Sequence, residues 1–397
     1  MNAPVRNSVK GQLPFVGNLK TFFAHSQSRA IGLVFASLSV QFGGWSTHIP
    51  YVKAKLGLDD AQLGLTLFAL PAGLVLMNPF SSLLIGRFGA PRVTLVSVLL
   101  YGFCVFIPVA APSVPVLVVG LFLTGTCGAL LNVAMNTCAT AIERTEKRTI
   151  MATCHGLWSL GGLVGAGLSS GLMGLRVSPQ VHMAVLAVIV FALNLLQRSV
   201  VMSVPFVRPE QPGAWFTWPN RALAGMILIG LAIGMGEGVA FDWSAVYLKD
   251  YLQTSGGIAA LGFAGFSLAM TLGRFTGDTL ILRFGENFLL TASGLVGAGG
   301  LALAILLPFP LTAIAGFTLL GAGCSLGAPI LYSASSRISG LAPGVGLATF
   351  ATFSFIGFLA GPPLIGIIAR EVNLSTGFSV VGVLLLAAAG LARKVEL

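Results

Sequence analysis

Long apolar segments alternate with short polar connections along almost the whole chain. Each segment holds about 20 mostly apolar residues, the length that an α-helix needs to cross a bilayer. We recognise twelve such segments, which begin near Ile31, Ala61, Val93, Pro115, Ile150, Val181, Ala222, Ile258, Phe288, Leu311, Val345 and Gly377. The pattern predicts an all-α membrane protein with twelve transmembrane helices.

The second six segments repeat features of the first six. Trp45-Ser46 corresponds to Trp243-Ser244, and the turn Arg87-Phe88-Gly89 recurs as Arg283-Phe284-Gly285. The longest connection without a span of its own separates the two copies and is rich in proline. The sequence therefore predicts a tail at 1–29, a six-helix bundle at 30–202, a linker at 203–220, a second six-helix bundle at 221–392 and a short tail at 393–397.

The composition supports a membrane class. Hydrophobic residues make up 55% of the chain and charged residues only 9%, whereas soluble domains hold about 25% charged residues. The net charge of +10 comes from arginines and lysines that collect in the connections on one side. This asymmetry follows the positive-inside rule. It predicts a multi-pass protein of the bacterial inner membrane with both termini cytoplasmic, and it argues against a nucleic-acid partner.

The sequence holds no pattern typical of an enzyme or a metal site. All five cysteines fall inside predicted spans without the spacing of metal ligands. There is no glycine-rich phosphate loop with a lysine, so direct use of ATP is not expected. We predict no catalytic residues, no metal and no cofactor, so that transport by this chain would depend on a gradient.

These features resemble a known family. The twelve-helix count, the turns Gly86–Gly89 and Arg283–Gly285 and the central linker are similar to the major facilitator superfamily over essentially the whole chain. The segments Trp45–Leu58, Asn136–Gly161 and Glu237–Leu248 are similar to its bacterial fucose-permease-like branch. The resemblance implies two halves that rock about a central solute site. Two positions depart from the family pattern: Gly86 replaces the usual acidic residue, and His48 stands where arginine is frequent.

The seventh segment carries two ionisable residues, Glu237 and Asp242. Charged groups inside a membrane are costly and usually functional. Glu237 lies among Gly234, Gly236 and Gly238, which favour a bent or partly unwound helix. Because a low dielectric disfavours a charged carboxylate, we predict a proton-coupling role for both residues. Asp242 could instead be solvated near the outer interface or pair with a neighbouring lysine.

Aromatic and hydrogen-bonding residues mark the predicted solute site. Gln41, Trp45 and His48 lie on one face of the first helix at i, i+4 and i+7. An indole beside hydrogen-bonding groups suits a sugar ring, although Trp45 could belong to an interfacial aromatic belt. The complete predicted solute set is Gln41, Trp45, His48, Asn132, Asn136, Trp158, Glu237 and Trp243.

Other polar residues have alternative interpretations. Asn132 and Asn136 could bind solute or could link neighbouring helices through hydrogen bonds. His155 is a candidate for proton coupling because imidazole titrates near neutral pH, or it could be a structural histidine bonded to a carbonyl or to Glu143.

Basic and acidic residues at the cytoplasmic ends predict a gate. Arg274 and Asp278 are four residues apart on the eighth helix, and Arg283 follows. With Arg87 they form the predicted gating set. The alternative is a static ion pair that anchors the helix end.

These predictions combine into one hypothesis with two alternatives. We expect a secondary active transporter that moves a small polar solute, most simply sugar-like, by alternating access, coupled to protons or another ion. The partners would be the solute, the coupling ion and the lipid bilayer, and we expect a monomer. The first alternative is a proton-driven exporter of amphipathic or drug-like compounds. The second alternative is a non-transporting membrane sensor or scaffold.

Overall fold

The computed structural model describes residues 21–146, 150–206, 218–335, 338 and 345–395, and within these ranges all regular structure is helical. The helices of the first half are α2 (Ser26–Leu56), α3 (Asp60–Leu67), α4 (Ala69–Phe88), α5 (Ala90–Cys104), α6 (Phe106–Ala110), α7 (Val114–Glu146), α8 (Met151–Gly174), α9 (Pro179–Leu196) and α10 (Arg198–Met202). Those of the second half are α11 (Arg221–Gly238), η1 (Val239–Trp243), α12 (Ser244–Val246), η2 (Tyr247–Tyr251), α13 (Gly256–Phe284), α14 (Glu286–Leu306), α15 (Pro310–Cys324), α16 (Gly327–Ser335), α17 (Val345–Glu371) and α18 (Leu374–Ala392).

Several of these helices are pieces of one longer span. Breaks separate α3 from α4, α5 from α6 and α15 from α16, and Pro71, Pro108 and Pro329 follow these breaks within four residues. Proline removes a backbone donor and clashes with the carbonyl four residues earlier, which interrupts a helix at that distance. When pieces that continue one another are joined, the described part of the chain contains twelve spans. The predicted all-α, twelve-helix fold is therefore confirmed.

The ends of the spans carry polar caps. Asp59 and Gln62 form a reciprocal capping box at the start of α3. Ser178, Ser255 and Asn373 accept hydrogen bonds from the first turns of α9, α13 and α18. Such caps satisfy backbone donors at helix starts, so the chain can turn sharply between antiparallel spans. Within the described residues, nine helical stretches are long and apolar enough to cross a membrane.

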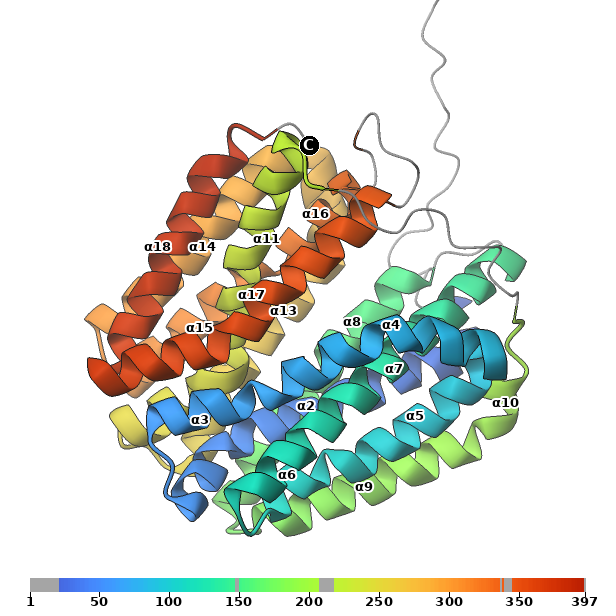
Figure 1. Ribbon diagram of the computed structural model, residues 1–397, viewed down its shortest axis with the longest axis horizontal. Coiled ribbons are helices and arrows are strands. Elements are labelled where there is room, and N and C mark those ends of the chain that lie inside the picture. The colour runs from blue at the N-terminus through green and yellow to red at the C-terminus, as the bar shows by residue number, and fades with distance from the viewer. Residues whose placement is uncertain (1–20, 147–149, 207–217, 336–337, 339–344, 396–397) are drawn as a thin grey trace, which may run out of the picture.

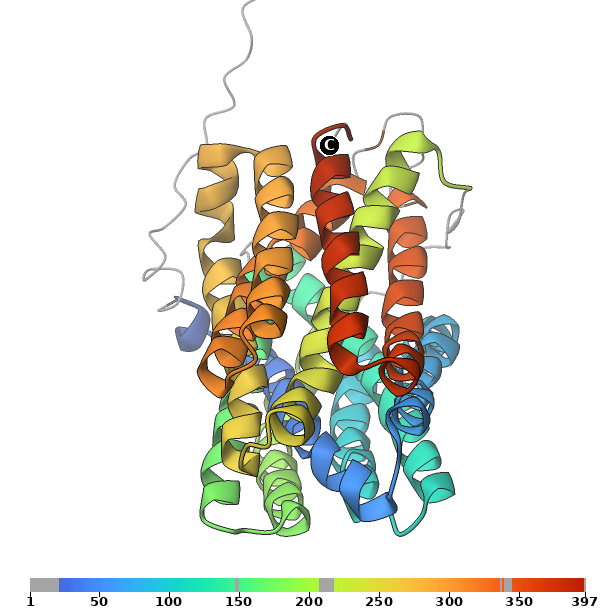
Figure 2. The same ribbon diagram turned by 90° about the vertical axis from the view of Figure 1, so that its left-hand side faces the viewer.

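The two halves form separate bundles that diverge toward one end in Figure 1; they are joined at the other end and along α8 and α13. At that end α3 of the first half packs on α17 of the second half. We call this end, which holds Leu56, Tyr251 and Glu371, the closed face. The other end holds Thr21, Arg221 and Ala392, and we call it the terminal face. Figure 2, turned by 90°, shows helices of both bundles running between these two ends.

The seventh span differs from its predicted shape. Instead of unwinding after the glycines, the helix continues from α11 through the π-helical turns η1 and η2. Gly238 keeps right-handed helical angles, with φ −59° and ψ −40°. Of the two predicted forms, a bent helix or a partly unwound one, the unwound form does not occur, because the wider π turns absorb the irregularity while the backbone stays helical. Single π turns often occur at functional sites.

Candidate functional site

A cavity of about 740 Å³ lies between the two halves. The first half contributes wall residues from α2, α4, α5, α7 and α8, and the second half contributes residues from α11, η1, α13, α16 and α17. Met151, the first residue of α8, belongs to the wall, so the cavity extends toward the terminal face. Its size falls within the range of small-molecule sites.

Five of the predicted solute or proton residues lie together on this wall: Asn132, Asn136, His155, Trp158 and Glu237. The Asn136 Nδ2 group donates to the carbonyl oxygen of Asn132 at 2.7 Å and to its Oδ1 atom at 3.1 Å. This contact fixes both amides on one face of α7. His155 makes an edge contact with the ring of Phe35, with 5.3 Å between ring centroids.

Arg274 also lies on the cavity wall, although the sequence placed it in an end gate. It comes from α13 of the second half, and its Nη1 atom donates to Ser159 Oγ of the first half at 2.9 Å. Its Cζ atom lies 5.5 Å from the centre of the Trp158 ring, within the range of a cation–π contact. Arg274 therefore links the two halves inside the cavity.

Glu237 faces the same space from α11. Its carboxylate interacts electrostatically with the Arg274 guanidinium. Among the described residues, however, the two groups form no ion pair within 4.0 Å. The cavity thus presents an acid and a base near each other that are not joined.

The predicted face of the first helix does not line the cavity in this conformation. Gln41 is 0%, Trp45 2% and His48 1% exposed. His48 Nε2 lies 2.8 Å from His182 Nδ1 of α9, and Gln41 Nε2 donates to the Ser37 carbonyl. The cavity face of α2 is instead Phe35, Leu38 and Phe42. Gln41 and Phe42 are one residue apart, a rotation of about 100° around the helix, whereas Trp45 lies on the face of Leu38 but about two turns nearer the closed face, beyond the cavity wall.

The remaining predicted residues have varied surroundings. Trp243 is fully buried, and Asp242 is half-buried outside the cavity wall. Arg87 and Arg283 are exposed, and their Cζ atoms lie 5.4 Å and 5.3 Å from the rings of Phe88 and Phe284. Asp278 belongs to α13, but its side chain lies outside the described residues.

The sequence reasoning missed Tyr101 of α5, Tyr332 of α16 and Thr124 of α7 as wall residues. Tyrosines in the middle of an apolar span are a usable signal, because a phenol needs either a hydrogen-bond partner or water. The position of Tyr332 three residues after Pro329, near a helix break, was a second signal.

The closed face holds a network of charged residues between the halves. Lys53 Nζ lies 2.8 Å from Asp60 Oδ1 of its own half and 2.7 Å from Asp250 Oδ2 of the other half. The Tyr251 hydroxyl donates to Asp60 Oδ2. Nearby, Ser170 Oγ donates to the Gly257 carbonyl at 2.7 Å. These bonds hold the halves together on the side away from the cavity opening.

We predict that the interaction of Lys53 with Asp250 stabilises the protein more than an ordinary surface ion pair does. Lys53 is only 13% and Asp250 31% exposed, so solvent and salt screen them less. In a double-mutant cycle of Lys53→Gln and Asp250→Asn, the coupling energy should reach about 0.5–3 kcal/mol. Apparent melting temperatures in detergent provide the measurement.

The matched control is the pair Arg370 and Glu371 at the same face, with side chains 52% and 61% exposed. The cycle at this pair should show almost no coupling. Additive effects of Lys53→Gln and Asp250→Asn would contradict the prediction.

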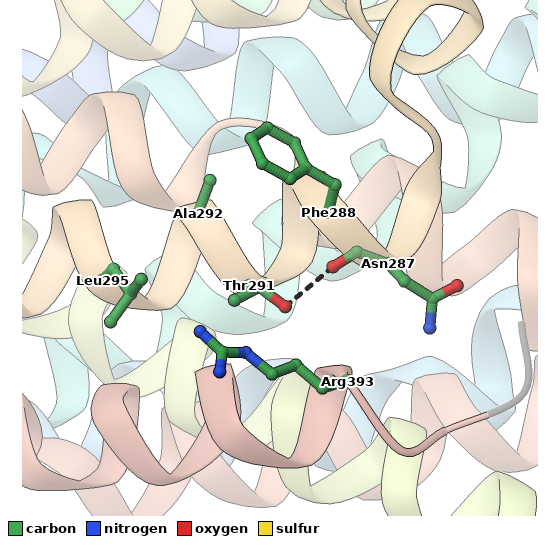
Figure 3. A pocket seen from close by; sticks show the side chains of 6 residues that line it. All are labelled: Asn287, Phe288, Thr291, Ala292, Leu295 and Arg393. Atoms are coloured by element: carbon green, nitrogen blue, oxygen red, sulfur yellow. Dashed lines mark hydrogen bonds between the residues drawn. The ribbon is translucent and has the colours of Figure 1, made fainter.

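A second, shallower hollow lies on the outside of the second half (Figure 3). It is lined along α14 by Phe288, Thr291 and Leu295, with Arg393 opposite. The Asn287 Nδ2 group donates to the carbonyls of Ala392 and Val395 at 2.8 Å each. These bonds fasten the end of α18 to α14, so the hollow reflects helix packing rather than the central site.

The fold and cavity are typical of one class of protein, membrane carriers with two helical bundles around a central cavity. The model of the Major Facilitator Superfamily matches residues 30–235. An uncharacterized MFS-type transporter of Yersinia pestis is 32% identical over 372 residues, which cover 93% of this chain and 96% of that protein. The chain belongs to the major facilitator superfamily, as its resemblance implied.

Solved structures show the same fold at low identity. A mutant of the nucleoside transporter NupG matches with a TM-score of 0.74 and 12% identity, covering 94% of this chain and 100% of that one. The E. coli fucose:proton symporter FucP matches with a TM-score of 0.64 and 16% identity, covering 93% and 98%. As a member of the major facilitator superfamily, the chain is a multi-pass membrane transporter and not an enzyme.

Proposed function

We propose that this transporter moves a small, polar, sugar-like solute across the bacterial inner membrane as a proton symporter. The terminal face would be cytoplasmic, as the positive-inside pattern of the sequence favours. The described conformation would then be open to the cytoplasm. The chain would act as a monomer, since one copy contains both halves of the cavity.

The observation that carries the proposal is the position of Glu237 on the wall of the shared cavity. A carboxyl group that faces a cavity inside a membrane can take up a proton on one side and release it on the other. Asn132, Asn136, His155 and Trp158 line the same space and would bind the solute. Two proteins of the same fold, a fucose:proton symporter and a D-xylose-proton symporter, support this substrate class by analogy.

Arg87, Arg274, Asp278 and Arg283 remain the proposed gating residues. Arg274 has the clearest role, because its bond to Ser159 crosses from one half to the other. Separation of the halves at this level would break that bond. The roles of Gln41, Trp45, His48, Asp242 and Trp243 require a conformation in which their surroundings change.

An exporter of amphipathic compounds is the second candidate. Phe35, Phe42, Phe241 and Phe350 all lie on the cavity wall, where apolar side chains outnumber polar ones. Met235, Phe266 and Met270, whose side chains would also suit such a wall, are instead buried and are not part of it. A cavity of about 740 Å³ argues against a non-transporting sensor, which would favour a closed interior.

Uptake into proteoliposomes tests the proposal. With an acidic exterior, labelled sugars and sugar derivatives should accumulate above the external concentration, and a protonophore should abolish the accumulation. Proton-driven movement of amphipathic dyes with no sugar uptake would favour the exporter. No gradient-driven movement of any polar solute would contradict the proposal.

A further inference from the structure

The charges on the described part of the cavity wall are few and opposite. Glu237 is its one acidic side chain and Arg274 its one permanent cation. His155 is the other side chain of this wall that could carry a positive charge, and it interacts electrostatically with Arg274. With Glu237 ionised and His155 neutral, the charges of the empty cavity sum to zero.

Arg274 has spare hydrogen-bonding capacity. A guanidinium carries five N–H donors, and among the described residues Arg274 donates one hydrogen bond, to Ser159. The Trp158 ring, whose centre lies 5.5 Å from Arg274 Cζ, contributes no oxygen or nitrogen acceptor for these donors. The donors that remain are suited to the two oxygens of a carboxylate, which guanidinium groups bind in a bidentate manner.

The surroundings of Glu237 contain no second cation among the described residues. The groups that interact with it electrostatically are Arg274 of α13, Cys324 of α15 and Tyr332 of α16. Neither the Cys324 thiol nor the Tyr332 phenol can supply the negative charge that is lost when Glu237 is protonated. Glu237 is therefore the one fixed counter-charge that this wall offers to Arg274.

Protonation of Glu237 disturbs this balance. When the carboxyl group takes a proton, Arg274 keeps its positive charge without a compensating negative one, in a region of low dielectric where such a charge is costly. A neutral solute leaves that charge unbalanced. An anionic solute restores the balance, because its carboxylate replaces Glu237 as the partner of Arg274.

We infer that the transported solute is a polar monoanion, a sugar acid or similar hydroxylated carboxylate, which binds Arg274 and travels with one proton on Glu237. This inference rests on the proposed proton symport and specifies its substrate class. Proton and anion then favour each other's binding, and both the empty and the loaded cavity are neutral. The carrier should consequently be driven by a pH gradient and not by membrane potential.

Proteoliposomes that contain the full chain can test this directly. The probes are labelled glucuronate, galacturonate and gluconate, compared with glucose and galactose, which lack the carboxylate. A pH gradient alone should drive uptake of at least one acid, whereas a valinomycin-clamped potassium potential alone should not. Arg274→Gln should weaken acid binding at least tenfold, and Arg274→Lys should recover part of the loss. Arg198→Gln, an exposed arginine on α10, is the matched control and should behave as the unmodified chain.

The outcomes separate this inference from the proposal beneath it. If neutral sugars accumulate with the pH gradient and the acids do not, proton symport stands and the anionic substrate is refuted. Acid uptake that responds to membrane potential refutes the electroneutral coupling. If neither group moves under any gradient, the proposed symport itself fails. Unchanged acid binding in Arg274→Gln, in a variant that folds with a normal melting temperature, refutes the role of Arg274.

Discussion

Replacing Glu237 with glutamine should abolish proton-driven accumulation while solute exchange continues. Glutamine has the size of a protonated glutamic acid but cannot release a proton, so the cavity can still bind and move solute. Under a pH gradient of one unit, one-proton symport can accumulate solute about tenfold at equilibrium. In Glu237→Gln this ratio should fall to one.

Two transport measurements distinguish the expected result from a general loss of activity. The first is net uptake under the pH gradient, and the second is exchange of labelled for unlabelled solute at equal pH. Glu371→Gln is the control, because Glu371 is a surface residue of the closed face that pairs with Arg370. Full accumulation by Glu237→Gln would rule out Glu237 as the proton carrier.

Replacing Gly64 with leucine should force the closed face apart. Gly64 of α3 lies against α17, and a Cβ atom there would approach the Pro362 carbonyl oxygen to 2.4 Å and Gly366 Cα to 3.1 Å. These neighbours are backbone atoms, which cannot rotate away. Helices with ordinary side chains at a contact pack about 8–10 Å apart, so α3 and α17 must separate.

The expected consequence is a shift toward conformations in which the closed face is open. Spin labels at Asp59 and Val372, both exposed near that face, should report a longer distance in a background without native cysteines. Uptake should fall at least about tenfold, because the halves can no longer close there and complete the transport cycle.

Gly167→Leu is the matched control for this substitution. Gly167 lies on α8 with no atom within 4 Å of an added Cβ, so its distance distribution and uptake should not change. The milder Gly64→Ala provides a second variant if leucine prevents folding. An unchanged distance in both Gly64 variants would show that the contact does not control closure.

Much of the fold could be read from the sequence because a bilayer imposes a simple rule. Backbone groups in the hydrocarbon core must bond within their own helix, so twelve apolar stretches implied twelve spans. Prolines follow the ends of α3, α5 and α15, but Pro362 and Pro363 lie inside the unbroken helix α17, so a proline alone did not determine where a helix ends. The behaviour of the chain after Gly234 was not predictable in the same way, since glycine permits both unwinding and the π turns that occur.

The candidate site was predictable in part. The free-energy cost of placing an acidic side chain inside the membrane singled out Glu237, because such a residue within a span usually has a function. Helical spacing placed Gln41, Trp45 and His48 on one face of α2, but spacing does not say which partner that face meets. In the structure His182 of α9 and other parts of the first bundle cover it.

The sequence by itself determined the class of protein, the number of spans and the presence of ionisable groups inside them, since these follow from hydropathy and desolvation. Only the tertiary structure decided which groups meet. Arg274 and Ser159 are far apart in the chain, and Lys53 and Asp250 belong to different halves, yet each pair is joined. The reason is physical: which faces of helices pack together depends on side-chain fit among several spans at once, and no single segment contains that information.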